Sequence, residues 1–311
     1  MRGEGPRTYE VIIIGGGPAG MTAGLYTTRS RLNTLLIELS LFGGQMTTTE
    51  LVENYPGFPD GINGSDLSQL MEKQAKRFGL ETIHQEVLEV KLEGGQKIVR
   101  TNESNYCTEA LIISSGTEYR KLGIPGEEAF IGKGVSFCAT CDGAFFRDSR
   151  VVVVGGGDSA LTEALFLTKF ASEVTIIHRR DALRATKIYQ ERTSANPKIK
   201  FLWNSVIQEI KGGKVVQSIL VKNIKTNKVE ELQTEGVFLF VGILPKTQFL
   251  KGLVQMDEGG YILTNEKCET SVKGIFAAGD CRKKLLRQIT TAVGDGATAA
   301  FAAEKYLEEK E

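Results

Sequence analysis

The chain has 311 residues, which at about 150 residues per domain predicts two domains. Apolar residues make up 41% and charged residues 24%, as in a globular protein, and 38 basic side chains balance 38 acidic ones. No overall charge therefore attracts nucleic acid or acidic lipid. No apolar run approaches the roughly 18 to 20 residues that cross a membrane, and the first ten residues lack the apolar stretch of a secretory signal. We expect a cytoplasmic protein without nucleic-acid or membrane partners.

The first predicted unit starts with an apolar strand at residues 9–14, which stops at a glycine-rich turn. A helix follows to about Arg29, and a second strand over residues 34–37 ends at Glu38. Strand, turn, helix and strand in this order predict a βαβ unit. In that context the turn GGGPAG predicts a dinucleotide phosphate at the helix N-terminus. Its expected binding residues are Gly15, Gly17, Pro18, Ala19 and Gly20.

Glu38 indicates which nucleotide the first turn accepts. A carboxylate at the end of the second strand accepts hydrogen bonds from ribose hydroxyls and repels a 2′-phosphate. The first turn is therefore predicted to bind FAD or NAD.

A Cys-Ala-Thr-Cys sequence at residues 138–141 is followed directly by Asp142. This spacing closes a small ring that a thiolate can reopen, which favours a redox pair over a structural disulfide. A zinc site needs four ligands, and Cys107, Cys268 and Cys281 are isolated, so no metal site is expected. Five cysteines without an export signal also argue against a disulfide framework. Asp142 is a candidate proton donor to a leaving thiolate or a helix N-cap, and the sequence leaves both open.

The βαβ order repeats with a constant offset, since Gly155 stands 140 residues after Gly15. A strand at residues 150–154 leads into the turn GGGDSA, a helix to about Phe170 and a strand over residues 173–177. The expected binding residues of this second turn are Gly155, Gly157, Asp158, Ser159 and Ala160.

A basic run stands where the first unit has Glu38. It consists of His178, Arg179 and Arg180, with Arg184 four residues further on. Guanidinium groups suit a phosphate dianion, so the second turn is predicted to bind NADPH. The alternative is a solvated basic strand end.

Two Gly- and Pro-containing stretches, at residues 116–126 and 241–248, divide the chain. We expect an α/β protein of two Rossmann-like three-layer domains, with residues 119–245 inserted between residues 1–118 and 246–311. The inserted domain then carries the NADPH site and the cysteine pair, and the outer parts form the FAD domain.

At this point the chain resembles the low-molecular-weight thioredoxin reductases of bacterial type over essentially its whole length. The motifs that carry the resemblance are GGGPAG, GGQ, ENYPGF, CATCDG, GGGDSA, HRRDALR, TSVKGIFAAGD and RQITTAVGDGA. Their order makes the resemblance specific. Larger disulfide reductases use a C-terminal histidine as a base, and no histidine follows His178 here.

The resemblance implies an activity. Electrons would pass from NADPH through FAD and the Cys138–Cys141 disulfide to thioredoxin, in a homodimer whose inserted domain rotates between two states. It implies that Cys138 attacks the thioredoxin disulfide, that Cys141 is its flavin-proximal partner and that Asp142 donates the proton. Alternatives are the same fold reducing another small redox protein, a different electron donor, or a non-enzymatic nucleotide sensor.

The resemblance also implies further flavin contacts, which are given at the end of this paragraph. Separately from the resemblance, we expect three aromatic side chains to pack inside the protein. Cys281 is expected to be a small buried side chain. The expected packing residues are Phe145, Phe146 and Trp203. The implied flavin contacts are Gly44, Gln45, Asn54, Gly279, Asp280, Arg287, Gln288 and Ile289.

Overall fold

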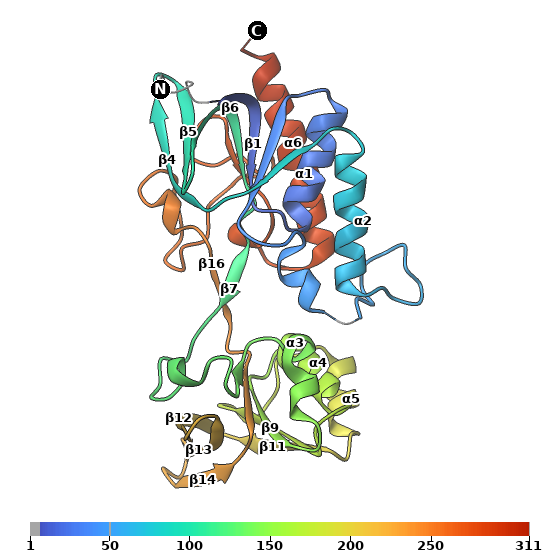
Figure 1. The fold of residues 1–311 in the computed structure, drawn as a ribbon, viewed down its shortest axis with the longest axis vertical. Coiled ribbons are helices and arrows are strands. Elements are labelled where there is room, and N and C mark those ends of the chain that lie inside the picture. The colour runs from blue at the N-terminus through green and yellow to red at the C-terminus, as the bar shows by residue number, and fades with distance from the viewer. Residues whose placement is uncertain (1–6, 50, 311) are drawn as a thin grey trace. The chain divides into compact units, whose positions relative to one another are not determined.

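A computed structural model describes residues 7–49 and 51–310 (Figure 1). The first six residues, which belong to the stretch examined above for a secretory signal, lie outside these ranges. The chain forms two compact units: unit 1 contains the residues up to Glu118 and from Leu244 onward, and unit 2 contains Tyr119–Ile243. The chain passes between the units twice, at the strands β7 (Thr117–Tyr119) and β16 (Ile243–Pro245), which pair with each other. These two strands are called the crossings below. Among the described residues, no helix combines the length and apolar character that a bilayer crossing requires.

Unit 1 is built on a mixed sheet with helices on one face. Its strands are β1 (Arg7–Ile14), β2 (Thr34–Glu38), β3 (Glu81–His84), β4 (Val87–Glu93), β5 (Gln96–Thr101), β6 (Asn105–Ile113) and β17 (Ile275–Ala277). Its helices are α1 (Pro18–Arg29), α2 (Gly64–Lys76) and α6 (Ile289–Glu308), with shorter 3-10 turns η1 (Gly44–Thr48), η4 (Gln248–Leu250) and η5 (Gly279–Cys281).

The strand order in unit 1 is β3-β2-β1-β6-β5-β4, with β17 also paired to β6. β1, β2, β3, β6 and β17 pair in parallel, and the β4–β5 hairpin extends the sheet in antiparallel fashion. The parallel part is the one that carries the first glycine turn.

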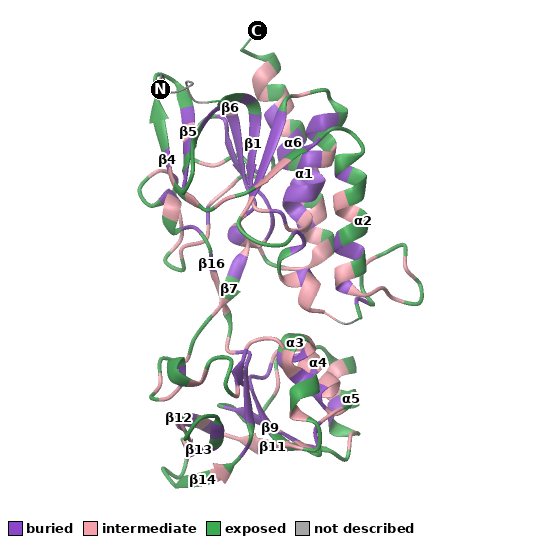
Figure 2. Ribbon diagram, viewed as in Figure 1, coloured by how far each residue is buried: buried purple, intermediate pink, exposed green. Residues whose placement is uncertain are grey.

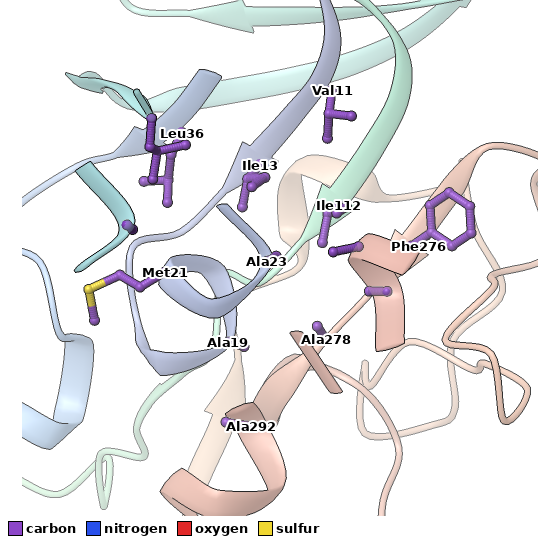
Figure 3. Packing of buried hydrophobic residues seen from close by; sticks show 14 of the residues in the cluster. Val11, Ile13, Ala19, Met21, Ala23, Leu36, Ile112, Phe276, Ala278 and Ala292 are labelled. Carbon is purple, nitrogen blue, oxygen red and sulfur yellow. The ribbon is translucent and has the colours of Figure 1, made fainter. Parts of the chain in front are cut away.

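The apolar run of β1 is buried on both faces because both faces are covered (Figure 2). Val11 and Ile13 pack with α1, α2 and α6, and Figure 3 shows them beside Ala23 and Ile112. Ile12 and Ile14 pack on the opposite face with the β4–β5 hairpin and residues 249–281. Each such side chain contributes about 1.5–3 kcal/mol on burial. The alternation of strand side chains therefore gives unit 1 two separate cores.

Unit 2 has a parallel sheet of order β11-β10-β9-β15-β8 and a separate antiparallel sheet of order β12-β13-β14. The parallel strands are β8 (Val135–Ser136), β9 (Arg150–Val154), β10 (Glu173–His178), β11 (Ile199–Trp203) and β15 (Gly236–Leu239). The antiparallel strands are β12 (Ser205–Gly212), β13 (Val216–Asn223) and β14 (Val229–Gln233). Its helical segments are η2 (Glu128–Phe130), α3 (Ala139–Asp142), η3 (Gly143–Phe146), α4 (Asp158–Leu167) and α5 (Lys187–Ser194).

Three layers also form in unit 2. Val151 and Val153 of β9 pack with α4, while Val152 and Val154 pack with β12 and β13. The predicted βαβ elements are confirmed, with one difference. The α4 helix ends at Leu167, three residues before the predicted end at Phe170, because the chain turns there toward β10.

Candidate functional site

The first glycine turn leaves no space for side chains at two positions. Gly15 has a φ of +104°, and a Cβ there would collide with the backbone of Ser114. A Cβ at Gly20 would collide with the carbonyl oxygen of Gly15. Gly17 has open space around it and precedes α1 without a side-chain cap, which leaves the first amides of α1 facing outward. The turn therefore fits a phosphate that approaches the backbone closely.

Glu38 lies directly beside this turn at the end of β2. Its Oε2 accepts a hydrogen bond from the amide of Gly16 at 2.6 Å, and its Oε1 accepts one from the amide of Ser40 at 3.0 Å. A carboxylate has about four acceptor positions, so both oxygens can still accept from ribose hydroxyls.

The loop before η1 also contacts the first turn. The amide of Gly43 donates to the carbonyl of Gly16 at 2.8 Å, and a Cβ on Gly44 would lie 3.7 Å from the Cα of Gly17. The side-chain amide of Gln45 is already used, because its Nε2 donates to the carbonyl and hydroxyl oxygens of Thr117 at 2.7 and 2.8 Å. In this structure Gln45 holds the start of β7, a role that the sequence did not indicate.

The C-terminal motif that contains Gly279 and Asp280 lies against the first glycine turn and α1. A Cβ on Gly279 would lie 2.9 Å from the Cβ of Ala19 in α1. The next residue, Asp280, is largely buried, and its Oδ1 has no hydrogen-bond partner among the described residues. Burial raises the pKa of this carboxyl, opposed by the charges of Lys284 and Arg287. A buried acceptor of this kind suits a ligand that donates hydroxyl groups, as the FAD ribityl chain does.

The other implied flavin residues cluster at the start of α6. The Nδ2 of Asn54 donates to the Oε1 of Gln288 at 2.9 Å, although 234 residues separate them. Gln288 caps α6 and Ile289 is its first residue. Arg287 donates through Nε to the carbonyl of Asp280 at 3.4 Å. Residues from three parts of the sequence thus meet in unit 1.

The second glycine turn, in unit 2, repeats the geometry of the first. Gly155 has a positive φ, packs against the Cβ of Ala160 and begins the turn before α4. Gly157 has open space around it and no side-chain cap follows it. Asp158 and Ser159 are the first two residues of α4. The second turn therefore also leaves backbone amides available to a phosphate.

Two bonds tie the basic loop after β10 to this second turn. The amide of Arg184 donates to the carbonyl of Gly156 at 2.7 Å, and the Oδ1 of Asp158 accepts from the amide of Thr186 at 2.6 Å. The side chains of Arg179, Arg180 and Arg184 are exposed and make no ion pair within the residues that the structure describes. Three uncompensated guanidinium groups beside the turn suit a phosphate dianion.

His178 differs from the arginines. Its ring is 5% exposed, packs against the Cα of Gly156 and lies 3.1 Å through Nε2 from the carbonyl oxygen of Ala182. Burial, and then the nearby arginines, lower its pKa, which favours the neutral ring. His178 therefore packs under the glycine turn as a buried side chain. The exposed arginines are the groups available to a phosphate.

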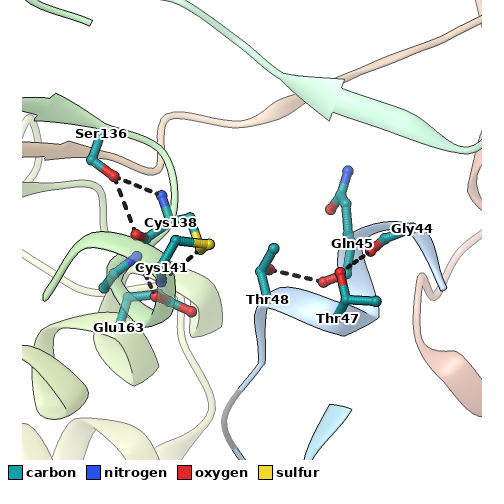
Figure 4. Close-up of a disulfide and its surroundings, with 9 residues drawn as sticks. Gly44, Gln45, Thr47, Thr48, Ser136, Cys138, Cys141 and Glu163 are labelled. Carbon is teal, nitrogen blue, oxygen red and sulfur yellow. Dashed lines mark hydrogen bonds between the residues drawn. A yellow bond between two sulfur atoms is a disulfide. The ribbon is translucent and has the colours of Figure 1, made fainter. Parts of the chain in front are cut away.

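Cys138 and Cys141 form a disulfide whose Cα atoms are 5.4 Å apart (Figure 4). Cys138 is the N-cap of the short α3 helix, and its Sγ accepts the amide hydrogen of Cys141 at 3.1 Å. Cys141 is exposed, whereas Cys138 is half-buried. The Oγ of Ser136 accepts from the amide of Cys138 at 3.0 Å and donates to its carbonyl at 3.2 Å.

Asp142 does not act as an N-cap for α3, because Cys138 holds that position. It precedes η3 without a side-chain cap bond. Of the two roles that the sequence left open, the structure gives no support to capping.

Glu163 is a site residue that the sequence reading missed. It lies on α4 and accepts the amide hydrogen of Ala139, the first residue of α3, at 2.9 Å (Figure 4). Desolvation by burial raises its pKa to about 7, opposed by hydrogen bonds from the amides of Ala139 and Thr140. Its one signal in the sequence is that it is the only charged residue in the mostly apolar stretch A-L-T-E-A-L-F-L, residues 160–167.

The expectation for Phe145 is wrong. Its side chain is 82% exposed, four residues after Cys141, so it is not a packing residue of unit 2. Phe146 does pack, edge-on against Phe238, and Trp203 stacks on Phe201. Cys281 is fully buried, as expected, and burial raises its pKa to about 11.

Comparison with known proteins decides the family. A family model described as pyridine nucleotide-disulphide oxidoreductase matches residues 9–296. The thioredoxin reductase of Bacillus subtilis (strain 168) is 51% identical over 306 residues, which cover 97% of this chain and 96% of the relative. The chain belongs to the low-molecular-weight thioredoxin reductases. The predicted family and the predicted fold of two Rossmann-like domains are thereby confirmed.

Two solved thioredoxin reductases have nearly the same sequence identity to this chain. The enzyme from Lactococcus lactis, in a conformation named FR, is 49% identical with a TM-score of 0.95 and covers 97% of this chain and 99% of its own. The enzyme from Streptococcus pyogenes MGAS5005 is 48% identical with a TM-score of 0.66 and covers 98% of this chain and 100% of its own. Thioredoxin reductases of similar sequence therefore differ in how well their structures superpose on this one.

The raised pKa of Glu163 gives a first prediction about stability. Between its ordinary pKa of 4.5 and about 7, the folded protein binds more protons at this site than the unfolded chain does. The free energy of unfolding therefore falls as the pH rises through this window. Glu163→Gln removes the titration, so we expect the variant to gain about 2–3 kcal/mol relative to the parent between pH 5 and pH 8.

Thermal unfolding of both proteins at pH 5 and pH 8 measures this gain. Glu191→Gln, at an exposed position on α5, is the matched control and should show no such change. A stability difference between Glu163→Gln and the parent that stays constant across the two pH values would contradict the prediction.

Proposed function

We propose that this protein is an NADPH-dependent thioredoxin reductase that passes electrons through FAD and the Cys138–Cys141 disulfide to thioredoxin. The observation that carries the proposal is a Cys-x-x-Cys disulfide in the same unit as a glycine turn flanked by three free arginines. Half of the sequence is identical to thioredoxin reductases over nearly the full chain.

Unit 1 is the proposed FAD domain. The first glycine turn and the start of α1 would hold the pyrophosphate, and Glu38 the adenosine ribose. Asp280 would accept from the ribityl region through its unpartnered Oδ1. The Gly44 loop, Asn54 and the start of α6 would complete the pocket. All of these residues belong to unit 1.

Unit 2 is the proposed NADPH domain. The turn at Gly155 and Gly157 would hold the pyrophosphate. Arg179, Arg180 and Arg184 would bind the 2′-phosphate with charge-assisted hydrogen bonds. His178 would contribute by supporting the turn from its buried position.

When bound, the two cofactors supply hydride and electron transfer, and the protein supplies binding, position and thiol chemistry. In the thiol chemistry, one thiolate of the reduced pair attacks a sulfur of the thioredoxin disulfide and displaces the other sulfur. The second thiolate then attacks the mixed disulfide, closes the Cys138–Cys141 bond and releases the thioredoxin dithiol, which takes up two protons.

We propose the roles that the resemblance implies, in which Cys138 is the cysteine that attacks thioredoxin. Exchange is started by a thiolate, so the cysteine whose thiolate is stabilised is the better nucleophile. The amide hydrogen that Cys138 accepts from Cys141 stabilises a thiolate at Cys138. In this proposal Cys138 attacks thioredoxin, and Cys141, the flavin-proximal partner, closes the disulfide. Asp142 is the proposed proton donor.

We also propose that the two units rotate relative to each other during turnover, about the crossings β7 and β16. The support is the resemblance and the spread of TM-scores, 0.95 and 0.66, between two relatives of nearly equal identity. A family whose members are solved in more than one arrangement is expected to show such a spread.

A cytoplasmic homodimer is proposed from the same resemblance. The cysteines outside the redox pair, Cys107, Cys268 and Cys281, are buried and unbonded, which fits a reducing compartment. Light scattering that gives the mass of a single chain would contradict the dimer.

The main test uses Cys141→Ser. We expect the purified variant to be yellow and to lose its flavin absorbance when NADPH is added, because both cofactor sites remain. It should reduce thioredoxin at least a hundredfold more slowly than the parent, because it cannot form the dithiol. Measurements are the visible spectrum under argon and the thioredoxin-coupled reduction of a disulfide dye. Full turnover by the variant would overturn the proposed function.

Trapping experiments distinguish the two cysteines. The thioredoxin used has a single cysteine, activated as a mixed disulfide with an aromatic thiol, so that attack by the enzyme thiolate releases the aromatic thiolate. Cys141→Ser leaves Cys138 as the only thiol of the pair, and we expect it to form a mixed disulfide with this thioredoxin. Cys138→Ser should form several-fold less of this complex, since the amide of Cys141 stabilises the thiolate at Cys138. Non-reducing electrophoresis measures the yield. A higher yield with Cys138→Ser would assign the attack to Cys141.

The arginines are tested by cofactor preference. Replacing both Arg179 and Arg180 by alanine should lower kcat/KM for NADPH at least about tenfold, because a single charge-assisted bond already contributes about 1.5–3 kcal/mol. We expect kcat/KM for NADH to change less than threefold. Arg192→Ala, at an exposed position on α5, serves as control. Equal losses of kcat/KM with NADPH and NADH would show that the arginines do not bind the 2′-phosphate.

A further inference from the structure

Glu163 is partly buried on α4, and its carboxylate contacts the backbone of the helix that carries the redox pair. Its carboxylate accepts the amide hydrogen of Ala139 at 2.9 Å and also that of Thr140. These are the first two residues of α3. A helix leaves its first amides without partners inside the helix, so an acceptor from another element is needed when they are buried.

The bonds around the disulfide divide into three sets. Ser136 holds the backbone amide and carbonyl of Cys138. Glu163 holds the two amides that follow. The amide of Cys141 goes to the Sγ of Cys138. Glu163 occupies the first two amides of α3, and the third amide, that of Cys141, points to the sulfur of Cys138. The carboxylate therefore fixes the backbone conformation that places the two sulfurs.

We propose that Glu163 is a positioning residue for the redox pair, which holds the N-terminal amides of α3 so that the sulfurs of Cys138 and Cys141 stay within bonding reach. The inference rests on the proposed function, because Glu163 acts only through these cysteines. It adds a residue on α4 to the machinery that the Cys-x-x-Cys motif and Asp142 describe.

Preorganisation is the physical basis of the expected effect. Closing a disulfide between two thiols is favoured when the backbone already holds them together, since less orientational freedom is lost on bond formation. If the amides of α3 lose their acceptor, the reduced pair samples more arrangements. The equilibrium between dithiol and disulfide then moves toward the dithiol.

The experiment measures this equilibrium directly in the flavin-loaded enzyme. Parent and variants are equilibrated with fixed ratios of reduced and oxidised dithiothreitol, and the reduced fraction of the pair is found from the mass added by alkylation. Glu163→Ala removes the acceptor. Glu163→Gln keeps an acceptor oxygen at the same reach, and Glu163→Asp keeps the charge but shortens the reach by one methylene. Glu191→Gln is the exposed control.

We expect Glu163→Ala and Glu163→Asp to shift the equilibrium about tenfold toward the dithiol, which corresponds to about 30 mV. Glu163→Gln should shift it less than threefold and the control not at all. Rescue by glutamine separates positioning from a general structural role, which would change the thermal midpoint without moving this equilibrium. If Glu163→Ala does not fold with bound flavin, the dithiol–disulfide equilibria of Glu163→Asp and Glu163→Gln are compared instead and test the same point.

Two results would overturn the inference. One is a folded Glu163→Ala or Glu163→Asp variant whose equilibrium stays within twofold of the parent. The other is a shift in Glu163→Gln as large as that in Glu163→Asp, since the acceptor would then not be what matters. Neither result depends on NADPH or thioredoxin. A failure of the proposed function would instead appear in the parent, as flavin that NADPH does not reduce or thioredoxin that is not turned over.

Discussion

The backbone reversal between a buried strand and the helix that follows it is the constraint on which both units depend. In unit 1 the chain leaves β1 through Gly15, whose positive φ and contact with Ser114 admit no side chain. Gly20 then lets α1 lie directly on that turn. Because the helix begins so close to the strand end, its first amides face outward at the edge of the sheet, where a phosphate binds. The same reversal at Gly155 gives unit 2 its own site.

What surrounds each reversal makes the two sites different. In unit 1 a carboxylate, Glu38, accepts from the amides of Gly16 in the turn and of Ser40, and leaves acceptor positions for ribose hydroxyls. In unit 2 the corresponding strand end carries the buried ring of His178 and a loop of exposed arginines, whose Arg184 amide bonds back to Gly156. In the proposed function, one backbone geometry serves two nucleotides, and the charges at the end of the second strand select between them.

The redox pair depends on contacts that cross between elements. Cys138 and Cys141 stand on a helix of only four residues, which has too few internal bonds to be stable alone. Ser136 and Glu163 supply acceptors from β8 and α4, and the disulfide itself closes the turn. The reactive segment is therefore held in place by its neighbours.

The sequence by itself determined the two βαβ units, the glycine turns, Glu38, the arginines and the cysteine pair, because each is encoded by residues close together in the chain. Only the tertiary structure decided the contacts of Glu163, Gln45 and His178, since their partners lie on other elements or are backbone atoms that carry no sequence signal. Exposure was likewise a tertiary outcome. Phe145 and Phe146 are adjacent and identical in type, yet one is exposed and the other packs on Phe238, because a chain buries only the side of a turn that faces its core.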